Sequence, residues 1–235
     1  KKKKMSLPNK RSELEAFVKK ICEEFKRDES HHFDHMQRVA TLSLELLEAY
    51  PWLKNDYTET VYAVGILHDV ADHKYDIDGM LQKRLYQFLV ELYGEEGAVF
   101  VLDIIDCISY SKEEEAKRNG TFEDWDKRLG CFGAIVRNIV SDADKLEALG
   151  KGGFKRCFDY IKNKNPEYTN SEILEAIKDH ASKKLLRLKD EFIVTPLGKK
   201  RAETAHRNFV EELEQFEYVC TVSWLQNLKK MTTED

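Results

Sequence analysis

Apolar residues recur every three or four positions along most of the chain, which is the spacing of amphipathic helices. No segment shows the strict alternation of a half-buried strand. We therefore predict an all-α protein, a bundle of helices. One clear apolar stripe before Pro51 consists of Val39, Leu42, Leu46, Leu47 and Tyr50.

Capping signals indicate where several of these helices begin. The stretches SELE at 12–15 and TNSE at 169–172 each have the hydroxyl and the carboxylate of a capping box. Asp56 is a candidate cap for a third helix. Thr195 followed by Pro196 predicts the start of a long last helix.

Further helices are predicted at about 79–93, 97–110 and 131–149. Residues 111–128, SKEEEAKRNGTFEDWDKR, are so polar that we expect a solvated loop there, which could cover a site. Trp125 in this stretch is a candidate for stacking on a base, although such a ring more often anchors a surface loop.

The composition indicates a globular chain without a strong charge bias. Of 235 residues, 42% are apolar and 34% are charged, and only 4 are prolines, which argues against disorder and favours one large domain. The net charge of −5 gives no electrostatic attraction to a nucleic acid polymer or to an anionic membrane. We expect neither as a partner.

The cysteines and the apolar runs bear on the compartment. The five cysteines are odd in number and lack a CxxC pair, so they indicate neither a disulfide framework nor a thiolate zinc site. No apolar run approaches the ~18 to 20 residues that span a bilayer, and the first residues lack the order of a signal peptide. We therefore expect a cytoplasmic protein.

Two histidines lie on the predicted apolar faces of helices. His35 is four residues before Val39, and His68 is seven residues after Val61, so both imidazoles are expected to point inward. Asp69 follows His68 directly, and an unpaired charge in such a position is costly. A bound cation would offset the carboxylate and keep the imidazoles neutral as ligands, so the pattern predicts a metal site.

A further inward carboxylate lies in SDADKLEAL, at 141–149. Helical periodicity places Asp142 nearer to the apolar stripe than Asp144, and either could join the site. A mixed set of imidazole nitrogens and carboxylate oxygens favours one divalent transition metal ion, namely Mn²⁺, Ni²⁺, Co²⁺, Fe²⁺ or Zn²⁺, over Ca²⁺.

Three motifs follow one another in the order His, His-Asp, Asp. They are HMQRV at 35–39, ILHDVAD at 66–72 and DADKLEALGKGGFKR at 142–156. This order resembles the HD-domain phosphohydrolase superfamily, which is named for such a metal site. The stretch KKLLRLKDEFIVTPLGKKRAETAHRNFVEELEQF, at 183–216, is similar to the C-terminal part of the small single-domain HD hydrolases of bacteria and fungi.

The resemblance implies a domain organisation. It extends over residues 12–217, which we expect to form a single-domain HD-domain helical bundle. Residues 1–11 are then a mobile basic tail, and residues 218–235 are the end of the last helix with a short tail. The long last helix either supports a homodimer or packs on its own core, and the pattern does not decide between the two.

The resemblance also implies roles for individual residues. The metal ligands that it implies are His35, His68, Asp69 and Asp144, the last because the superfamily's ligand is the aspartate of an Ala-Asp-x-Leu run. Asp72 matches the acidic position that orients the attacking water or protonates the leaving group, so we expect a general acid/base there. A carboxylate in a surface salt bridge is the plainer alternative for this residue.

Two cations and one departure from the family pattern complete the expected site. Arg38 and Lys74 are close in sequence to the ligands and are expected to bind a substrate phosphate, although Arg38 could instead brace a ligand carboxylate. His32 stands where the subgroup usually has the aspartate of His-Asp-x-x-His, so the hydrogen bonds around the ligands are expected to differ there.

The function implied by the resemblance is metal-dependent hydrolysis of phosphate esters or anhydrides, with nucleotides as the substrate class. Both nucleoside triphosphate pyrophosphohydrolysis and 5′-monophosphate hydrolysis fit. The alternative is a catalytically weak regulatory module that binds a nucleotide or a metal on the same fold. A full ligand set together with Asp72 favours the enzyme, because a module released from catalysis need not keep them all.

Overall fold

A computed structural model of the chain describes residues 6–27, 32–72, 76, 78–121 and 123–231, with side chains up to residue 223. Within this part every regular element is a helix, which confirms the predicted all-α fold. None of the described helices is long and apolar enough to span a lipid bilayer. In chain order the elements are α1 (Arg11–Glu24), α2 (Phe33–Leu47), α3 (Pro51–Leu67), α4 (Met80–Asp106), α5 (Tyr110–Arg118), α6 (Trp125–Glu147), α7 (Gly150–Lys164), α8 (Asn170–Lys183), the 3₁₀ turn η2 (Leu185–Arg187), α9 (Leu188–Glu191) and α10 (Pro196–Met231).

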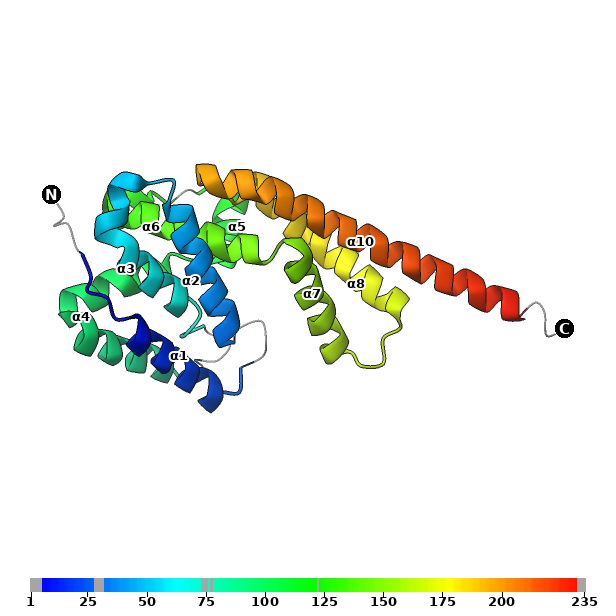
Figure 1. The fold of residues 1–235 in the computed structure, drawn as a ribbon, viewed down its shortest axis with the longest axis horizontal. Coiled ribbons are helices and arrows are strands. Elements are labelled where there is room, and N and C mark those ends of the chain that lie inside the picture. Colours follow the sequence, from blue (N-terminus) through cyan, green and yellow to red (C-terminus); the bar gives the residue numbers. More distant parts are fainter. Residues whose placement is uncertain (1–5, 28–31, 73–75, 77, 122, 232–235) are drawn as a thin grey trace. The chain divides into compact units, whose positions relative to one another are not determined.

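The chain forms two compact units. The first consists of the residues up to 144 together with 194–198, and the second consists of 145–193 together with the residues from 199 onwards. In the first unit α3 is the central helix and packs against α1, α2 and α4 (Figure 1). Because α3 has neighbours on several sides, residues 60–67, TVYAVGIL, are all buried, and most of them are apolar.

α2 and α3 approach each other very closely at one point. A Cβ atom added to Gly65 would lie only 2.8 Å from the Cα atom of Ala40, so only glycine fits there. Ala40 is five residues after His35, and Gly65 is three residues before His68. The close approach therefore keeps His35 on α2 near His68, which directly follows α3.

Replacing Gly65 by alanine is expected to destabilise the protein by about 1 to 3 kcal/mol, because the new methyl group would meet the backbone of Ala40. Urea denaturation measures the difference in the free energy of unfolding. Gly152→Ala is the matched control, since a Cβ atom there meets nothing within 4 Å and alanine is the better helix former. An equal loss in both variants would contradict the importance of the close approach.

The start of α1 differs from the prediction. α1 begins at Arg11, one residue before Ser12, and its N-cap residue Lys10 makes no side-chain capping hydrogen bond. SELE is therefore not a capping box. The backbone N–H of Arg11 donates to Oδ1 of Asn9 at 3.3 Å instead, and the Arg11 guanidinium pairs with both carboxylate oxygens of Glu59 at 2.9 and 3.1 Å. These contacts of Arg11 fix the helix start upstream of the serine.

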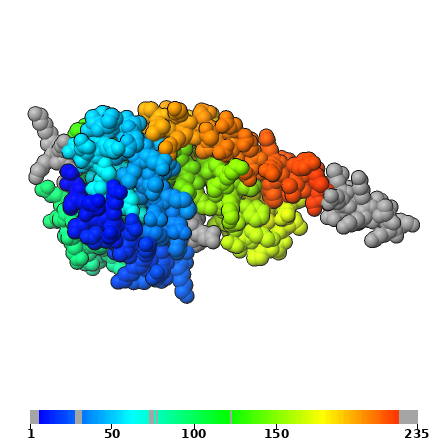
Figure 2. Space-filling view, viewed as in Figure 1, coloured from blue at the N-terminus to red at the C-terminus, as the bar shows by residue number. Residues whose placement is uncertain are grey.

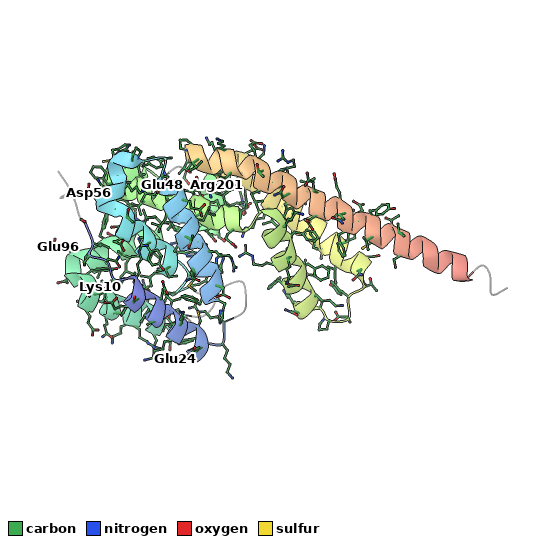
Figure 3. All side chains as sticks on the ribbon, viewed as in Figure 1. Lys10, Glu24, Glu48, Asp56, Glu96 and Arg201 are labelled. Carbon is green, nitrogen blue, oxygen red and sulfur yellow. The ribbon has the colours of Figure 1, made fainter. Side chains whose placement is uncertain are left out.

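The predicted start of the third helix is also wrong. α3 begins at Pro51, so Asp56 lies inside the helix instead of capping it (Figure 3). A proline is favourable at the first helical position, because the N–H that it lacks has no partner inside the helix in any case. Pro51 follows the end of α2 and at the same time starts α3.

Two other capping signals are confirmed. The backbone N–H of Thr169 donates to Glu172 Oε2 at 2.8 Å and that of Glu172 donates to Thr169 Oγ1 at 3.3 Å, so TNSE is the capping box of α8. The backbone N–H of Gly198 donates to Thr195 Oγ1 at 3.1 Å, and Pro196 is the first residue of α10.

α4 and α6 each bend at a glycine. Gly94 has a φ of 73° and divides α4 close to the boundary between the predicted helices 79–93 and 97–110. Gly130 has a φ of 74° and divides α6 just before the predicted helix 131–149. An L side chain is strained at such φ values, so glycine allows each bend.

The polar stretch 111–128 is not the solvated loop that its composition predicts. Tyr110–Arg118 form α5, and Ser109 caps this helix by accepting a hydrogen bond from the backbone N–H of Lys112. After a short connection, α6 begins at Trp125.

A buried ion pair explains why the charged α5 is held in place. The guanidinium of Arg137 on α6 donates to Glu113 on α5, and Ser141 Oγ donates to the same Glu113 oxygen at 3.1 Å. The Arg137 guanidinium also lies 4.7 Å from the centre of the Trp125 ring. One face of this ring is therefore packed against an arginine instead of being open for a base.

The second unit has a cluster of partly buried aromatic rings. α7 packs against α8, and the ring of Phe216 on α10 lies 6.0 Å from that of Phe154 and 5.4 Å from that of Phe158, both on α7. These rings meet edge to face, which is a favoured geometry for aromatic pairs.

Candidate metal centre

Four side chains of the first unit converge at one point. His35 is on α2, His68 and Asp69 directly follow α3, and Asp144 lies near the end of α6. His35 Nε2 lies 3.5 Å from Asp144 Oδ1 and 3.8 Å from Asp69 Oδ2. His68 Nε2 lies 3.5 Å from Asp69 Oδ2 and 3.7 Å from Asp144 Oδ1. The ligand atoms of His35, His68 and Asp144 all lie within 4.8 Å of one another.

These separations suit a shared cation. Nitrogen and oxygen ligands lie about 2.0 to 2.2 Å from a divalent transition metal, so ligands of one ion are expected about 3 to 4 Å from each other. The two imidazoles are almost fully buried, whereas the side chains of Asp69 and Asp144 are 23% and 38% exposed. In the same unit α1 and α2 lie against each other and form part of its surface (Figure 2).

The ring of His68 is held by one nitrogen and turns the other toward the carboxylates. Its Nδ1 lies 2.8 Å from the backbone carbonyl oxygen of Gly65, and because a carbonyl only accepts, Nδ1 carries the hydrogen. In the neutral ring the lone pair is then on Nε2, which faces the two carboxylates. This Nε2 atom is buried and has no hydrogen-bond partner. Because buried polar atoms are seldom left unpartnered, the observation points to a ligand at this position.

The carboxylates of Asp69 and Asp144 make the space between the four side chains favourable for positive charge. Burial by itself lowers the pKa of His68, but Asp69, Asp144 and the carbonyl of Gly65 raise that pKa to about 9. Desolvation opposes the ionisation of Asp144, but the rings of His35 and His68 hold its pKa well below the ordinary value. Without a metal the site thus attracts a proton, and a divalent cation would compete for the same place.

The structure separates the two aspartates of SDADKLEAL. Asp144 lies beside the imidazoles, whereas the fully buried Asp142 accepts hydrogen bonds from the segment that precedes α10. Its Oδ2 accepts from the backbone N–H of Thr195 at 2.7 Å and from Thr195 Oγ1 at 2.6 Å, and its Oδ1 accepts from the N–H of Val194 at 3.0 Å. Periodicity thus identifies Asp142 correctly as inward, but its partners are the backbone at 194 and 195 and the Thr195 hydroxyl.

Of the other predicted site residues, the structure describes Asp72 and Arg38. Asp72 is half-buried, and its backbone N–H donates to the carbonyl oxygen of Asp69 at 3.2 Å, in a hydrogen-bonded turn that follows the end of α3. Arg38 is exposed on α2, one turn after His35. Lys74 lies outside the described residues.

The position before α2 is occupied by His32, where the resemblance leads one to expect an aspartate. His32 is exposed, has extended backbone and is the N-cap residue of α2, but it makes no side-chain capping hydrogen bond. An aspartate is a far better N-cap residue than most others, since its carboxylate accepts from the first N–H groups of a helix. With His32 at this position, the start of α2 next to His35 has no side-chain cap.

One residue near the centre is missed by the sequence analysis. Arg27 follows α1, is 5% exposed, and donates to the backbone carbonyl oxygens of Asp69 and Val70. A buried arginine is rare unless its donors are paired. No periodic pattern includes Arg27, because it lies beyond the end of its helix, and only its position in the folded chain brings it to Asp69.

Comparison with known proteins gives related chains and folds. No protein-family model matches the chain. YpgQ of Bacillus subtilis is 29% identical over 195 residues, which cover 80% of this chain and 86% of that protein. The crystal structure of YpgQ in complex with ADP aligns with a TM-score of 0.61 at 22% identity, over 88% of this chain and 93% of that one.

Two further relatives extend the comparison. The crystal structure of an HD-superfamily hydrolase from Bacillus thuringiensis is 28% identical and aligns with a TM-score of 0.59, over 90% of this chain and 96% of that one. The protein L803 of Acanthamoeba polyphaga mimivirus is 28% identical over 158 residues. That match covers 60% of this chain and 58% of L803.

Proposed function

Because its fold and the order of its His, His-Asp and Asp motifs make this chain a member of the HD superfamily, we propose that it is a divalent-metal-dependent phosphohydrolase that acts on nucleotides. The hydrolase from Bacillus thuringiensis supports the reaction class, since it aligns over nearly its whole length. In this proposal His35, His68, Asp69 and Asp144 hold one metal ion.

The observation that carries the proposal is the buried cluster of unlike ligands with an unpartnered nitrogen. His68 Nε2 makes no hydrogen bond, although it lies 3.5 Å from Asp69 and 3.7 Å from Asp144. A metal ion between these atoms would satisfy the nitrogen and both carboxylates at once. Two imidazole nitrogens with carboxylate oxygens suit Mn²⁺, Fe²⁺, Co²⁺, Ni²⁺ or Zn²⁺.

The residues of the chain divide the remaining work. When bound, a divalent ion lowers the pKa of a coordinated water and offsets negative charge on a phosphate. Asp72 is held one hydrogen-bonded turn after Asp69, and in this proposal it orients the attacking water or donates a proton to the leaving oxygen. Arg38 and Lys74 bind the phosphate through charge-assisted hydrogen bonds.

Nucleotides are the proposed substrate class because of YpgQ, whose crystal structure holds ADP. A triphosphate pyrophosphohydrolase and a 5′-nucleotidase need the same metal, water and proton donor, since each hydrolyses one bond to phosphorus. The two activities differ in their product, which is pyrophosphate in the first case and inorganic phosphate in the second.

A nucleotide panel tests the proposal. Phosphate and pyrophosphate release are measured from nucleoside mono-, di- and triphosphates with Mn²⁺, Co²⁺, Ni²⁺, Mg²⁺ or EDTA, for the wild type and for Asp69→Ala. We expect turnover that EDTA abolishes and that added metal restores. In Asp69→Ala the activity is expected to fall to that of the EDTA-treated wild type, because one ligand carboxylate is gone.

The control is Asp103→Ala, which removes an exposed carboxylate on α4 and should keep wild-type turnover. If the wild type binds Mn²⁺ and nucleotide, but neither the wild type nor Asp103→Ala releases phosphate or pyrophosphate under any condition, the hydrolase proposal is wrong. The chain would then be a regulatory binding module on the same fold.

A further inference from the structure

We propose that Arg27 is a positioning residue for the metal centre: its guanidinium clamps the backbone of Asp69 and Val70 and so fixes where the Asp69 carboxylate lies. The inference rests on the metal-dependent function proposed above, and it adds a residue that neither the motifs nor the family resemblance includes.

The clamp consists of two hydrogen bonds to consecutive carbonyl groups. Nη1 of Arg27 donates to the carbonyl oxygen of Asp69 at 2.6 Å, and Nη2 donates to that of Val70. Both carbonyls follow the last residue of α3, where backbone oxygens have no partner inside the helix and the negative end of the helix dipole lies. A buried guanidinium suits this place, because it donates hydrogen bonds to the carbonyl oxygens and its positive charge is favourable at the negative end of the helix dipole.

The end of α1 leads directly to this side chain. α1 ends at Glu24, and the N–H of Arg27 donates back to the carbonyl oxygen of Cys22 at 3.2 Å. Between them Lys26 has a φ of 45°, the only positive φ outside glycine in the part of the chain that the structure describes. A left-handed residue of this kind commonly ends a helix, and the N–H of Lys26 also donates back, to the carbonyl oxygen of Glu23 at 3.4 Å. These two hydrogen bonds to the last turn of α1 set the backbone position from which the Arg27 side chain extends.

The clamp affects both aspartates of ILHDVAD, namely Asp69 and Asp72. Asp69 Oδ2 lies 3.5 Å from His68 Nε2 and 3.8 Å from His35 Nε2, so a small rotation of its peptide would remove it from the cluster. The same carbonyl of Asp69 that accepts from Arg27 also accepts from the N–H of Asp72 at 3.2 Å. Arg27 therefore holds the start of the turn that carries the proposed acid/base.

The guanidinium is required for its geometry as well as for its charge. Arginine presents several donors in a fixed plane, which reach two neighbouring carbonyl groups at once. A lysine at this position would keep the positive charge but bind as a single point, so it would hold one carbonyl and release the other. Because Arg27 is 5% exposed, direct contact with a substrate is not its role.

The test measures metal binding in the full-length chain, independently of turnover. Arg27→Met is compared with the wild type by titration with Mn²⁺ and by the visible absorption spectrum of bound Co²⁺, which reports the ligand geometry. We expect Mn²⁺ affinity to fall about 10- to 100-fold, as for other residues that orient metal ligands, and the Co²⁺ spectrum to change. In turnover, kcat should fall more than KM changes. Arg27→Lys is expected to recover part of the affinity.

The matched control is Arg84→Met. Arg84 is on α4 and pairs with Glu24 at the end of α1 at 2.7 Å, so it also contacts this end of α1 but not the HD motif. We expect wild-type Mn²⁺ affinity and an unchanged Co²⁺ spectrum. If Arg27→Met fails to fold by circular dichroism, Arg27→Lys carries the test, and it must still bind Mn²⁺ more weakly than the wild type.

The outcomes separate this inference from the proposed function. Folded Arg27 variants with wild-type Mn²⁺ affinity and Co²⁺ spectrum would overturn the positioning role, while the metal centre itself would stand. If the wild type binds neither Mn²⁺ nor Co²⁺, or if Asp144→Ala binds them equally well, the proposed metal centre fails and the inference fails with it.

Discussion

Replacing Asp144 by alanine is expected to abolish metal binding while the helical fold is kept. Asp144 Oδ1 lies 3.5 Å from His35 Nε2 and 3.7 Å from His68 Nε2, and in the proposed metal centre it is the ligand from α6. Its side chain is 38% exposed, so its removal leaves no large buried cavity. Loss of a group that only orients a ligand weakens metal binding about 10- to 100-fold, and loss of the ligand itself should exceed this.

The measurement is the stabilisation that a metal gives. A ligand at about 100 times its Kd raises the free energy of unfolding by roughly 2.7 kcal/mol when it binds only the folded state. We expect such a gain for the wild type with Mn²⁺ in urea denaturation, and none for Asp144→Ala at the same concentration. Asp103→Ala, which removes an exposed carboxylate on α4, should retain the full gain. A wild-type gain in Asp144→Ala would show that Asp144 is not a ligand.

The inward direction of the two histidines could be predicted from the sequence because it depends on local geometry. His35 and His68 share the helical phase of the apolar residues around them, and both side chains are almost fully buried in the structure. That the two helices converge does not follow from this phase. It depends on the close approach at Gly65 and Ala40, where a glycine and an alanine far apart in sequence meet.

Periodicity fails where a polar residue is buried for a reason other than the site. Asp142 has the inward phase that a ligand would have, but its carboxylate accepts from the backbone N–H groups of Val194 and Thr195 and from the Thr195 hydroxyl, over fifty residues away. The family resemblance favours Asp144, which the structure places beside His35. It differs from periodicity because it rests on the Ala-Asp-x-Leu motif and not on the face of the helix on which a residue lies. Arg27 lies beyond the end of α1 and belongs to none of the three motifs, so neither periodicity nor resemblance identifies it.

Composition misleads for α5. The segment 111–128 is strongly charged, and charge alone predicts a solvated loop. The helix forms because Ser109 caps it and because Glu113 is paired with the buried Arg137. Such a pair is visible only when the helices are placed side by side, as polar side chains that bind one another have no hydrophobic periodicity.

Replacing Asp142 by alanine is expected to destabilise the protein by about 3 kcal/mol or more. Its carboxylate is fully buried and accepts from the N–H groups of Val194 and Thr195 and from the hydroxyl of Thr195. Bonds to a charged acceptor are stronger than average, and their loss would leave buried donors without a partner. Urea denaturation in EDTA measures the change without any contribution from a metal.

Thr195→Ala is the partner variant, since Thr195 both caps α10 and donates to Asp142. It is expected to lose about 1 to 2 kcal/mol, as for other N-cap residues. The double variant should lose less than the sum of the two single losses, because they share one hydrogen bond. Asp103→Ala should stay within about 0.5 kcal/mol of the wild type.

Asp142 and Asp144 are two residues apart, but their alanine variants should differ in what they lose: Asp142→Ala loses stability in EDTA, and Asp144→Ala loses the stabilisation by Mn²⁺. Asp142→Ala should lower the free energy of unfolding in EDTA and, where the variant is still folded, keep a gain with Mn²⁺, because the Asp142 carboxylate binds Val194 and Thr195 and does not lie beside the imidazoles. If instead Asp142→Ala lost the gain with Mn²⁺ and Asp144→Ala kept it, Asp142 would be the ligand. The carboxylate beside His35 and His68 would then have a different role.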